Sequence, residues 1–263
     1  MAPVSTPPAL SWLAAASALL DELGSTQADA IEQASQWCAE AIGADGLVHL
    51  FGTGHSRIPV EEMFPRYGSY PGFHPIVELS MTFHTQIVGA NGQRQAMYIE
   101  RTPGLAEVIL SNFTFGPHDV MMVFSAGGTT AVPVEIARGA RARGLRVIAV
   151  TAVRESLSAP VDPAVGSRLL DEADLVIDLC TPEADALCLI KGLDTPVGPG
   201  STIAAVAVVN SIKVRTAELL VARGTMPPVL TRASVVGAER SRDLFDSAYR
   251  EHARRISRVV GQR

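Results

Sequence analysis

Positive charge is scarce in this sequence. No lysine or arginine precedes Arg57, and the formal net charge of the whole chain is -5. A protein that binds nucleic acid needs a basic surface that neutralises phosphates. The sequence therefore predicts no nucleic-acid partner, and it argues in particular against a basic DNA-reading helix near the N-terminus.

Cysteine and long apolar runs are scarce as well. Cys38, Cys180 and Cys188 are odd in number and form no CxxC pair, so a reducing compartment fits better than a disulfide framework. No apolar run approaches the roughly 20 residues of a membrane span. The histidines show no compact metal-ligand spacing. We therefore expect a cytoplasmic protein with no membrane partner, no metal and no other cofactor.

The N-terminal part of the chain is predicted to be helical. Residues 1–8 lack the basic start of a signal peptide and are expected to form a disordered leader. Apolar residues then recur at spacings of three and four, which predicts a helical hairpin over residues 9–44, broken at Gly24 and capped at Ser25 or Thr26. Its apolar stripe is expected to pack on the core or on another subunit.

Strands and helices alternate over residues 45–223, which predicts an α/β domain with a parallel sheet covered on both faces. Residues 80–100 resist assignment, residues 153–173 are predicted to be irregular, and residues 181–199 form a long connection. A charged helical tail over residues 224–263 follows, with Leu244, Phe245, Tyr249 and Ile256 on its apolar side. The expected strands are 47–51, 76–79, 120–124, 146–151 and 175–179, and the expected helices are 57–67, 103–113, 133–143 and 202–222.

Two loops share one design: each follows a strand, contains glycine and hydroxyl residues, and precedes a helix. They are Gly52-Thr53-Gly54-His55-Ser56 and Ser125-Ala126-Gly127-Gly128-Thr129-Thr130. Ligands of parallel sheets lie beyond the carboxyl ends of the strands, where both loops fall. Glycine lets the backbone approach a ligand, and a helix N-terminus favours negative charge. The loops therefore predict an anion site, although neither matches a P-loop or a dinucleotide fingerprint.

These loops, together with Glu61-Glu62, Arg66 and a Gly200-Ser201-Thr202 run at the head of a long apolar helix, resemble the sugar isomerase (SIS) domain. Among its members, the chain is most similar to stand-alone bacterial proteins of the phosphoheptose-isomerase kind. The resemblance implies a flavodoxin-like three-layer sandwich with a five-stranded parallel sheet. It also implies a sugar-phosphate ligand and a homodimer or homotetramer with shared active sites. Family members carry a phosphate-binding serine where this chain has Gly127, so a sulfonated or uncharged sugar is a further possibility.

Isomerisation of an aldose to a ketose needs a base and an acid that face each other. Glu62 is the candidate base, with Glu61 as second choice, although Glu62 is also spaced to pair with Arg66 on a helix surface. His55 is the candidate acid, because histidine titrates near neutral pH and this one lies inside a glycine loop; its alternative role is to brace that loop. His74 and His84 are weaker candidates that either reach the site or serve structural roles. Asp194 is a weak candidate for an acidic residue preceding Ser201.

The sequence therefore favours a sugar or sugar-phosphate isomerase that works through an enediol-type intermediate. Two alternatives remain open: a non-catalytic sugar-phosphate sensor, and a lyase or etherase that acts on an amino-sugar phosphate. The expected catalytic residues are Glu62 and His55, and the expected substrate-binding residues are Gly54, Ser56, Arg66, Ser125, Gly127, Gly128, Thr129, Thr130, Ser201 and Thr202.

Overall fold

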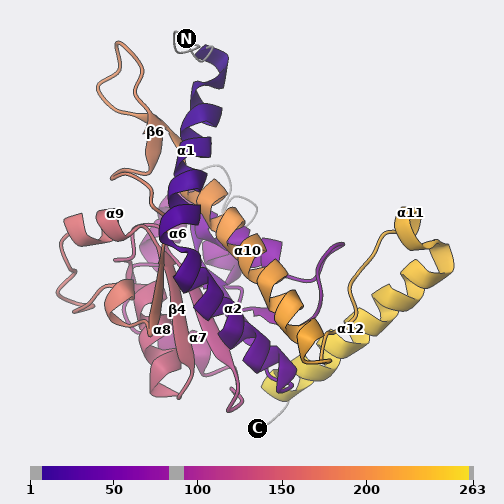
Figure 1. The fold of residues 1–263 in the computed structure, drawn as a ribbon. Coiled ribbons are helices and arrows are strands. Elements are labelled where there is room, and N and C mark those ends of the chain that lie inside the picture. Colours follow the sequence, from indigo (N-terminus) through magenta and orange to yellow (C-terminus); the bar gives the residue numbers. More distant parts are fainter. Residues whose placement is uncertain (1–7, 83–91, 261–263) are drawn as a thin grey trace.

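The computed structural model describes residues 8–82 and 92–260, and its centre is a five-stranded parallel sheet (Figure 1). The strand order is β2-β1-β3-β4-β5. The chain leaves β1 towards one edge of the sheet and then crosses back to β3, so the strand order reverses between these two neighbours. This is the place where open α/β sheets bind ligands. The strands are β1 (Val48–Gly52), β2 (Phe73–Pro75), β3 (Val120–Phe124), β4 (Arg146–Thr151) and β5 (Leu175–Asp178).

Helices cover both faces of the sheet, which confirms the predicted three-layer α/β sandwich. Alternate strand residues point to opposite faces: Leu50 and Met122 pack towards α2 and α10, whereas Met121 and Val123 pack towards α7 and α8. No helix in the described ranges is long and apolar enough to cross a membrane. The helices are α1 (Ser11–Thr26), α2 (Ala28–Gly43), α3 (Ile58–Met63), α4 (Leu79–Thr82), α6 (Gly92–Ile99), α7 (Leu105–Leu110), α8 (Ala131–Ala142), α9 (Val153–Ser158), α10 (Ser201–Ala222), α11 (Ala233–Val236) and α12 (Ala238–Val260).

The edge strand β2 lies earlier in the chain than residues 76–79, where we predicted it. Phe73, which is fully buried, pairs with Val48. Pro75 ends β2, and proline is tolerated on an edge strand because its missing N–H is not needed there. Two prolines and two glycines made residues 68–75 resemble a loop, which concealed the strand.

The two predicted N-terminal helices are present, and they run end to end rather than side by side (Figure 1). Gln27 alone separates α1 from α2. The hydroxyls of Ser25 and Thr26 donate back to the carbonyl of Glu22, so these residues extend α1 instead of capping α2. As a result, α2 packs along α10, while α1 reaches the small hairpin formed by β6 (Ala186–Cys188) and β7 (Val197–Pro199).

Several predicted boundaries are wrong. The helix expected over residues 57–67 is only α3, which follows a 3-10 turn and ends at Met63, because Pro65 disfavours a helical conformation at Phe64. The helix expected over residues 103–113 spans only α7. Helix α9 lies in the supposedly irregular residues 153–173, and the β6–β7 hairpin lies in the connection over residues 181–199.

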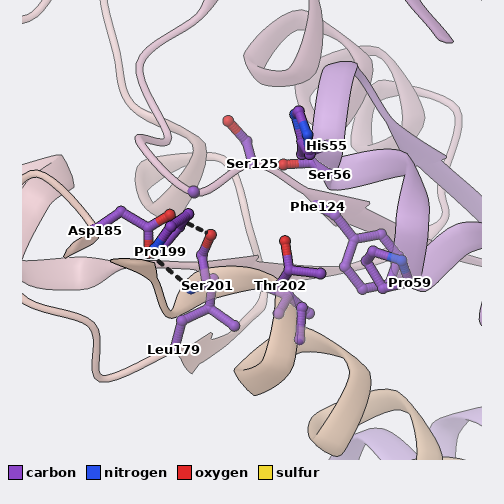
Figure 2. A pocket seen from close by; sticks show the side chains of 13 residues that line it. His55, Ser56, Pro59, Phe124, Ser125, Leu179, Asp185, Pro199, Ser201 and Thr202 are labelled. Atoms are coloured by element: carbon purple, nitrogen blue, oxygen red, sulfur yellow. Dashed lines mark hydrogen bonds between the residues drawn. The ribbon is translucent and has the colours of Figure 1, made fainter. Parts of the chain in front are cut away.

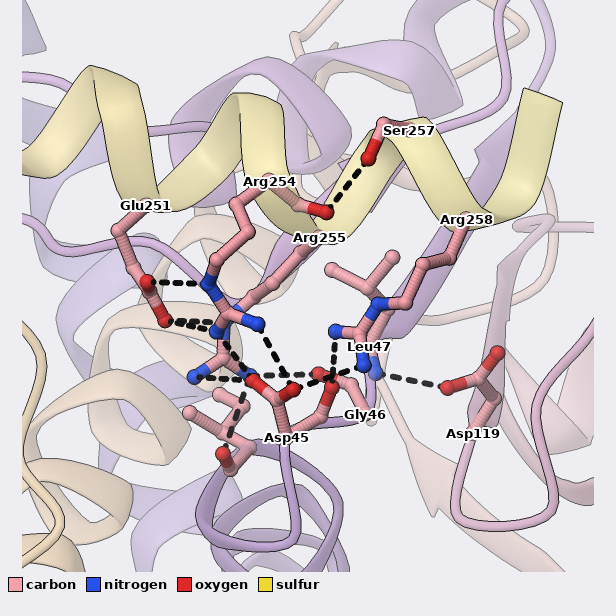
Figure 3. A network of polar contacts seen from close by, with 10 residues as sticks. Asp45, Gly46, Leu47, Asp119, Glu251, Arg254, Arg255, Ser257 and Arg258 are labelled. Carbon is pink, nitrogen blue, oxygen red and sulfur yellow. Dashed lines mark hydrogen bonds and ion pairs between the residues drawn. The ribbon is translucent and has the colours of Figure 1, made fainter. Parts of the chain in front are cut away.

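The charged tail contains helix α12, and a cluster of ion pairs ties the C-terminal half of this helix to the loop after α2 (Figure 3). Asp45 pairs with Arg254 and Arg258, and Arg255 donates to the carbonyls of Ile42 and Gly46. Hydrogen bonds from Arg254 hold the pKa of Asp45 well below its usual range. The face of α12 that is buried differs from the predicted one: Phe245 and Tyr249 stack on each other and stay partly exposed.

Candidate active site

The two glycine loops lie side by side, because β1 and β3 are hydrogen-bonded neighbours in which Gly52 pairs with Phe124. Next to them opens a cavity of about 260 Å³, which lies between the loops and the head of α10 (Figure 2). A second hollow of about 250 Å³ lies between the loops and α6, and it shares His55, Ser56, Ser125 and Ala126 with the first cavity. The two cavities bring together most of the predicted site residues, namely Gly54, His55, Ser56, Ser125, Gly127, Thr130, Ser201 and Thr202.

Close backbone packing shapes the first loop. A Cβ atom on Gly52 would lie 2.3 Å from the carbonyl oxygen of Ser56, so only glycine allows the chain to fold back into the 3-10 turn that carries His55. The hydroxyl of Thr53 donates to Glu100 at 2.6 Å. Glu100 thereby becomes a carboxylate on the wall of the second hollow, which the sequence did not reveal.

The second loop presents backbone N–H groups. Gly128 has a left-handed φ of 63°, and its own N–H donates to the hydroxyl of Ser125 at 3.2 Å. The N–H groups of Gly127 and Thr129 find no acceptor among the described residues. They lie just before the N-terminus of α8, whose dipole favours an anion. This loop can therefore hold an anion without a basic side chain.

Replacing Gly128 with alanine is expected to lower the free energy of unfolding by about 2 kcal/mol, because alanine disfavours the left-handed conformation. The added Cβ would also lie 2.7 Å from the hydroxyl of Thr151. Gly127→Ala is the matched control, since its Cβ would meet only Glu155, at 3.5 Å. Urea unfolding of both variants measures the difference. Equal stabilities would show that the conformation at Gly128 does not constrain the loop.

The head of α10 is held by an acidic residue that we did not predict. Asp185 accepts hydrogen bonds from the N–H groups of Gly200 and Ser201, and from the Ser201 hydroxyl at 2.6 Å (Figure 2). Gly200 is the N-cap of α10, and Ser201 is the first residue of the helix. Asp194 lies exposed instead, in the connection between β6 and β7. The β6–β7 hairpin brings Asp185 and Ser201, which are 16 positions apart in the chain, into contact.

A further carboxylate, Glu155 of α9, lies behind the second loop. Its Oε1 atom is 3.5 Å from the position that a Cβ on Gly127 would take, and its Oε2 atom is buried with no partner among the described residues. Burial, followed by the negative charges of Asp185 and Glu183, raises the pKa of Glu155. An anion bound on the loop would raise this pKa further.

Glu62 and Arg66 do not line either cavity. Glu62 lies one helical turn beyond Pro59, which does line the first cavity, and it faces α10. Its carboxylate accepts a hydrogen bond from Arg66 at 2.7 Å and one from Asn210 at 3.3 Å. The predicted pairing of Glu62 with Arg66 is thus present. Glu61 pairs with Arg57 and is exposed.

The other candidate histidines are placed elsewhere or not described. His74 is buried near the amino ends of the strands, 2.8 Å from His49 and away from the glycine loops. His84 lies outside the described residues. Within the described ranges, no three or more His, Cys, Asp or Glu side chains are grouped to hold a metal ion.

Comparison with known proteins agrees with this geometry. The model of the SIS domain matches residues 11–152. The chain belongs to the SIS-domain family. A UPF0309 protein of Listeria monocytogenes is 31% identical over 233 residues, covering 89% of this chain and 92% of that protein. One of Streptomyces coelicolor is 31% identical over 232 residues, covering 88% and 90%.

The fold comparison extends to proteins that are distant in sequence. A phosphoheptose isomerase from Francisella tularensis superposes with a TM-score of 0.52 at 12% identity, covering 79% of this SIS-domain chain and 95% of that chain. At this identity the likeness shows a shared fold. The predicted family and the predicted sandwich are both confirmed.

Proposed function

We propose that this SIS-domain protein is a sugar-phosphate isomerase whose substrate binds across the two glycine loops. The observation that carries the proposal is the convergence of these loops and the head of α10 on one cavity, which is lined by hydroxyls of Ser56, Ser125 and Thr202. A ring of hydroxyls and backbone N–H groups suits a ligand with many hydroxyls and one anionic group.

The anionic end of the substrate lies on the second loop in this proposal. The N–H groups of Gly127 and Thr129, the hydroxyl of Thr130 and the dipole of α8 would hold it. Gly127 contributes no hydroxyl, and Glu155 stands behind it. A phosphate is therefore bound chiefly by the backbone, and a sulfonate would satisfy the same donors.

The reacting end of the substrate lies towards α3 and α10. His55 reaches the cavity from the first loop and is the proposed acid that polarises the carbonyl or opens the sugar ring. Glu62 is the proposed base. Arg66 donates to the Glu62 carboxylate at 2.7 Å and fixes its position. The substrate must extend one helical turn beyond Pro59 to meet Glu62.

Incubation in D₂O with a panel of aldose and ketose phosphates tests the proposal. Amino-sugar phosphates, sulfonated sugars and free sugars complete the panel. An isomerase incorporates deuterium at the carbon next to the carbonyl and yields the partner sugar, both visible by NMR. Deuterium with loss of water or of an ether substituent would indicate the lyase instead. A sugar phosphate that raises the melting temperature without any exchange would identify a sensor and contradict the proposal.

A further inference from the structure

Among the described residues, no arginine or lysine lines either cavity of the candidate site, although the proposed substrate carries an anionic group. The titratable side chains on the cavity walls are His55, Asp185 and Glu100. Glu155 adds a further carboxylate next to the second loop. A bound dianion would therefore be repelled by these carboxylates, unless a proton offsets part of the repulsion.

Glu155 differs from the other two carboxylates in its hydrogen bonding. Its Oε2 atom is buried with no partner in the part of the chain that the structure describes. In contrast, Asp185 accepts from the Ser201 hydroxyl at 2.6 Å, and Glu100 accepts from the Thr53 hydroxyl at 2.6 Å. A buried oxygen without a donor is costly above all when the carboxylate is ionised. Protonation of Glu155 relieves this cost, whereas protonation of Asp185 or Glu100 would weaken an existing hydrogen bond.

The charges around Glu155 also favour a proton there. Burial raises its pKa, and the negative charges of Asp185 and Glu183 raise it further. Asp178 lies at the start of α9, where it accepts from a backbone N–H. The cation beside α9 is Arg168, which donates to two backbone carbonyls at the end of the helix rather than to Glu155.

Glu155 lies close enough to the second loop to interact with an anion bound there. Its Oε1 atom is 3.5 Å from the position that a Cβ on Gly127 would take. An anion oxygen that accepts from the Gly127 N–H is then at most about 9 Å from Oε1, which is within the screening length of roughly 10 Å at 0.1 M salt. We propose that an anion binding to the second loop takes up one proton from solution, and that Glu155 holds this proton. This coupling rests on the anionic end of the substrate lying on the second loop, as in the proposed function.

The coupling makes the affinity for an anion depend on pH in a defined direction. Above the pKa of Glu155 in the complex, its carboxylate is ionised both with and without the anion, and no proton is taken up. Below its pKa in the free protein, it is protonated in both states. Between these two values the affinity rises as the pH falls, by up to tenfold for each pH unit.

Calorimetric titration with sodium sulfate, in two buffers of different ionisation enthalpy, measures the proton uptake. Sulfate remains a dianion from about pH 5 to pH 8, so the protons taken up are those of the protein. The wild type should take up protons on binding, and it should bind sulfate about tenfold more tightly at pH 5 than at pH 8. Sodium chloride at equal ionic strength is the blank.

Three variants identify the group that takes up the proton. Glu155→Gln should bind sulfate about tenfold more tightly than the wild type at pH 8, with no proton uptake, because glutamine is neutral at every pH. His55→Gln removes the histidine on the cavity wall and should keep the uptake of the wild type. Glu107→Gln is the matched control, because this carboxylate of α7 pairs with Arg143 and lines neither cavity.

Two results would overturn the coupling without affecting the proposed reaction, which deuterium exchange tests separately. One is sulfate binding to the wild type with no proton uptake. The other is uptake that persists in Glu155→Gln and disappears in His55→Gln. If sulfate binds neither the wild type nor Glu155→Gln at any pH, the second loop holds no anion, and the coupling fails together with the proposed position of the substrate.

Discussion

Replacing Glu62 with glutamine is expected to lower the turnover number by about a thousandfold, with a much smaller effect on substrate affinity. A general base contributes roughly 10² to 10⁴ in rate, and glutamine keeps the shape of the side chain but cannot take up the proton. One of the two side-chain hydrogen bonds survives, because the amide oxygen can accept either from Arg66 or from Asn210. Initial rates on the substrate identified by deuterium exchange would measure the effect.

Two other carboxylates serve as controls for the Glu62→Gln result. Glu61→Gln changes the adjacent residue on the same helix, which is exposed and pairs with Arg57, and should leave the rate within about twofold. Glu100→Gln changes a carboxylate that does line the second hollow and accepts from Thr53. If Glu100→Gln lowers the turnover number by about a thousandfold and Glu62→Gln does not, then Glu100 is the base and Glu62 is not.

The central sheet could be predicted because each buried strand is a continuous apolar run bounded by turn residues. Strand β4 was placed over residues 146–151 as observed, and β3 and β5 were also found. The edge strand was misplaced because an edge strand tolerates the prolines that normally indicate a loop. Local sequence patterns thus identified the strands whose stability comes mainly from burial. They failed for the edge strand, whose position depends on its pairing with β1.

The candidate site could be predicted only in part for the same reason. Both glycine loops were identified, because their conformations depend on residues adjacent in the chain. Asp185, Glu100 and Glu155 were missed. Glu100 and Glu155 reach the glycine loops, and Asp185 reaches the head of α10, each from a different part of the chain. No local spacing signals such a contact. Glu62 was correctly placed on α3, but the sequence could not show that it faces Asn210 and lies beside the cavity rather than in it.

The buried histidine pair at the other end of the sheet makes the protein sensitive to acid. Asp119 can only accept, so His49 Nε2 donates to it at 3.0 Å, and the Nδ1 atoms of His49 and His74 lie 2.8 Å apart, within hydrogen-bond distance. Burial, with a smaller contribution from His49, lowers the pKa of His74 to about 3. Burial also lowers the pKa of His252, on α12.

We expect the free energy of unfolding to fall by about 2 kcal/mol between pH 7.5 and pH 5 because of His74 alone. The unfolded chain protonates His74 near the ordinary pKa of 6.5, whereas the folded protein does so only near 3. Below pH 6.5 the unfolded state therefore binds more protons than the folded state. The free energy of unfolding decreases as the pH is lowered, until about pH 3. Urea unfolding followed by tryptophan fluorescence at several pH values gives the slope.

His74→Gln should flatten this slope while lowering stability at pH 7.5, because glutamine does not titrate but leaves His49 less well partnered. The exposed His118, next to Asp119 in the chain, supplies the control: His118→Gln should keep the wild-type slope. The residual slope of His74→Gln then reports His252, whose pKa is shifted in the same direction. An unchanged slope in His74→Gln would show that His74 is not the group that couples protonation to unfolding.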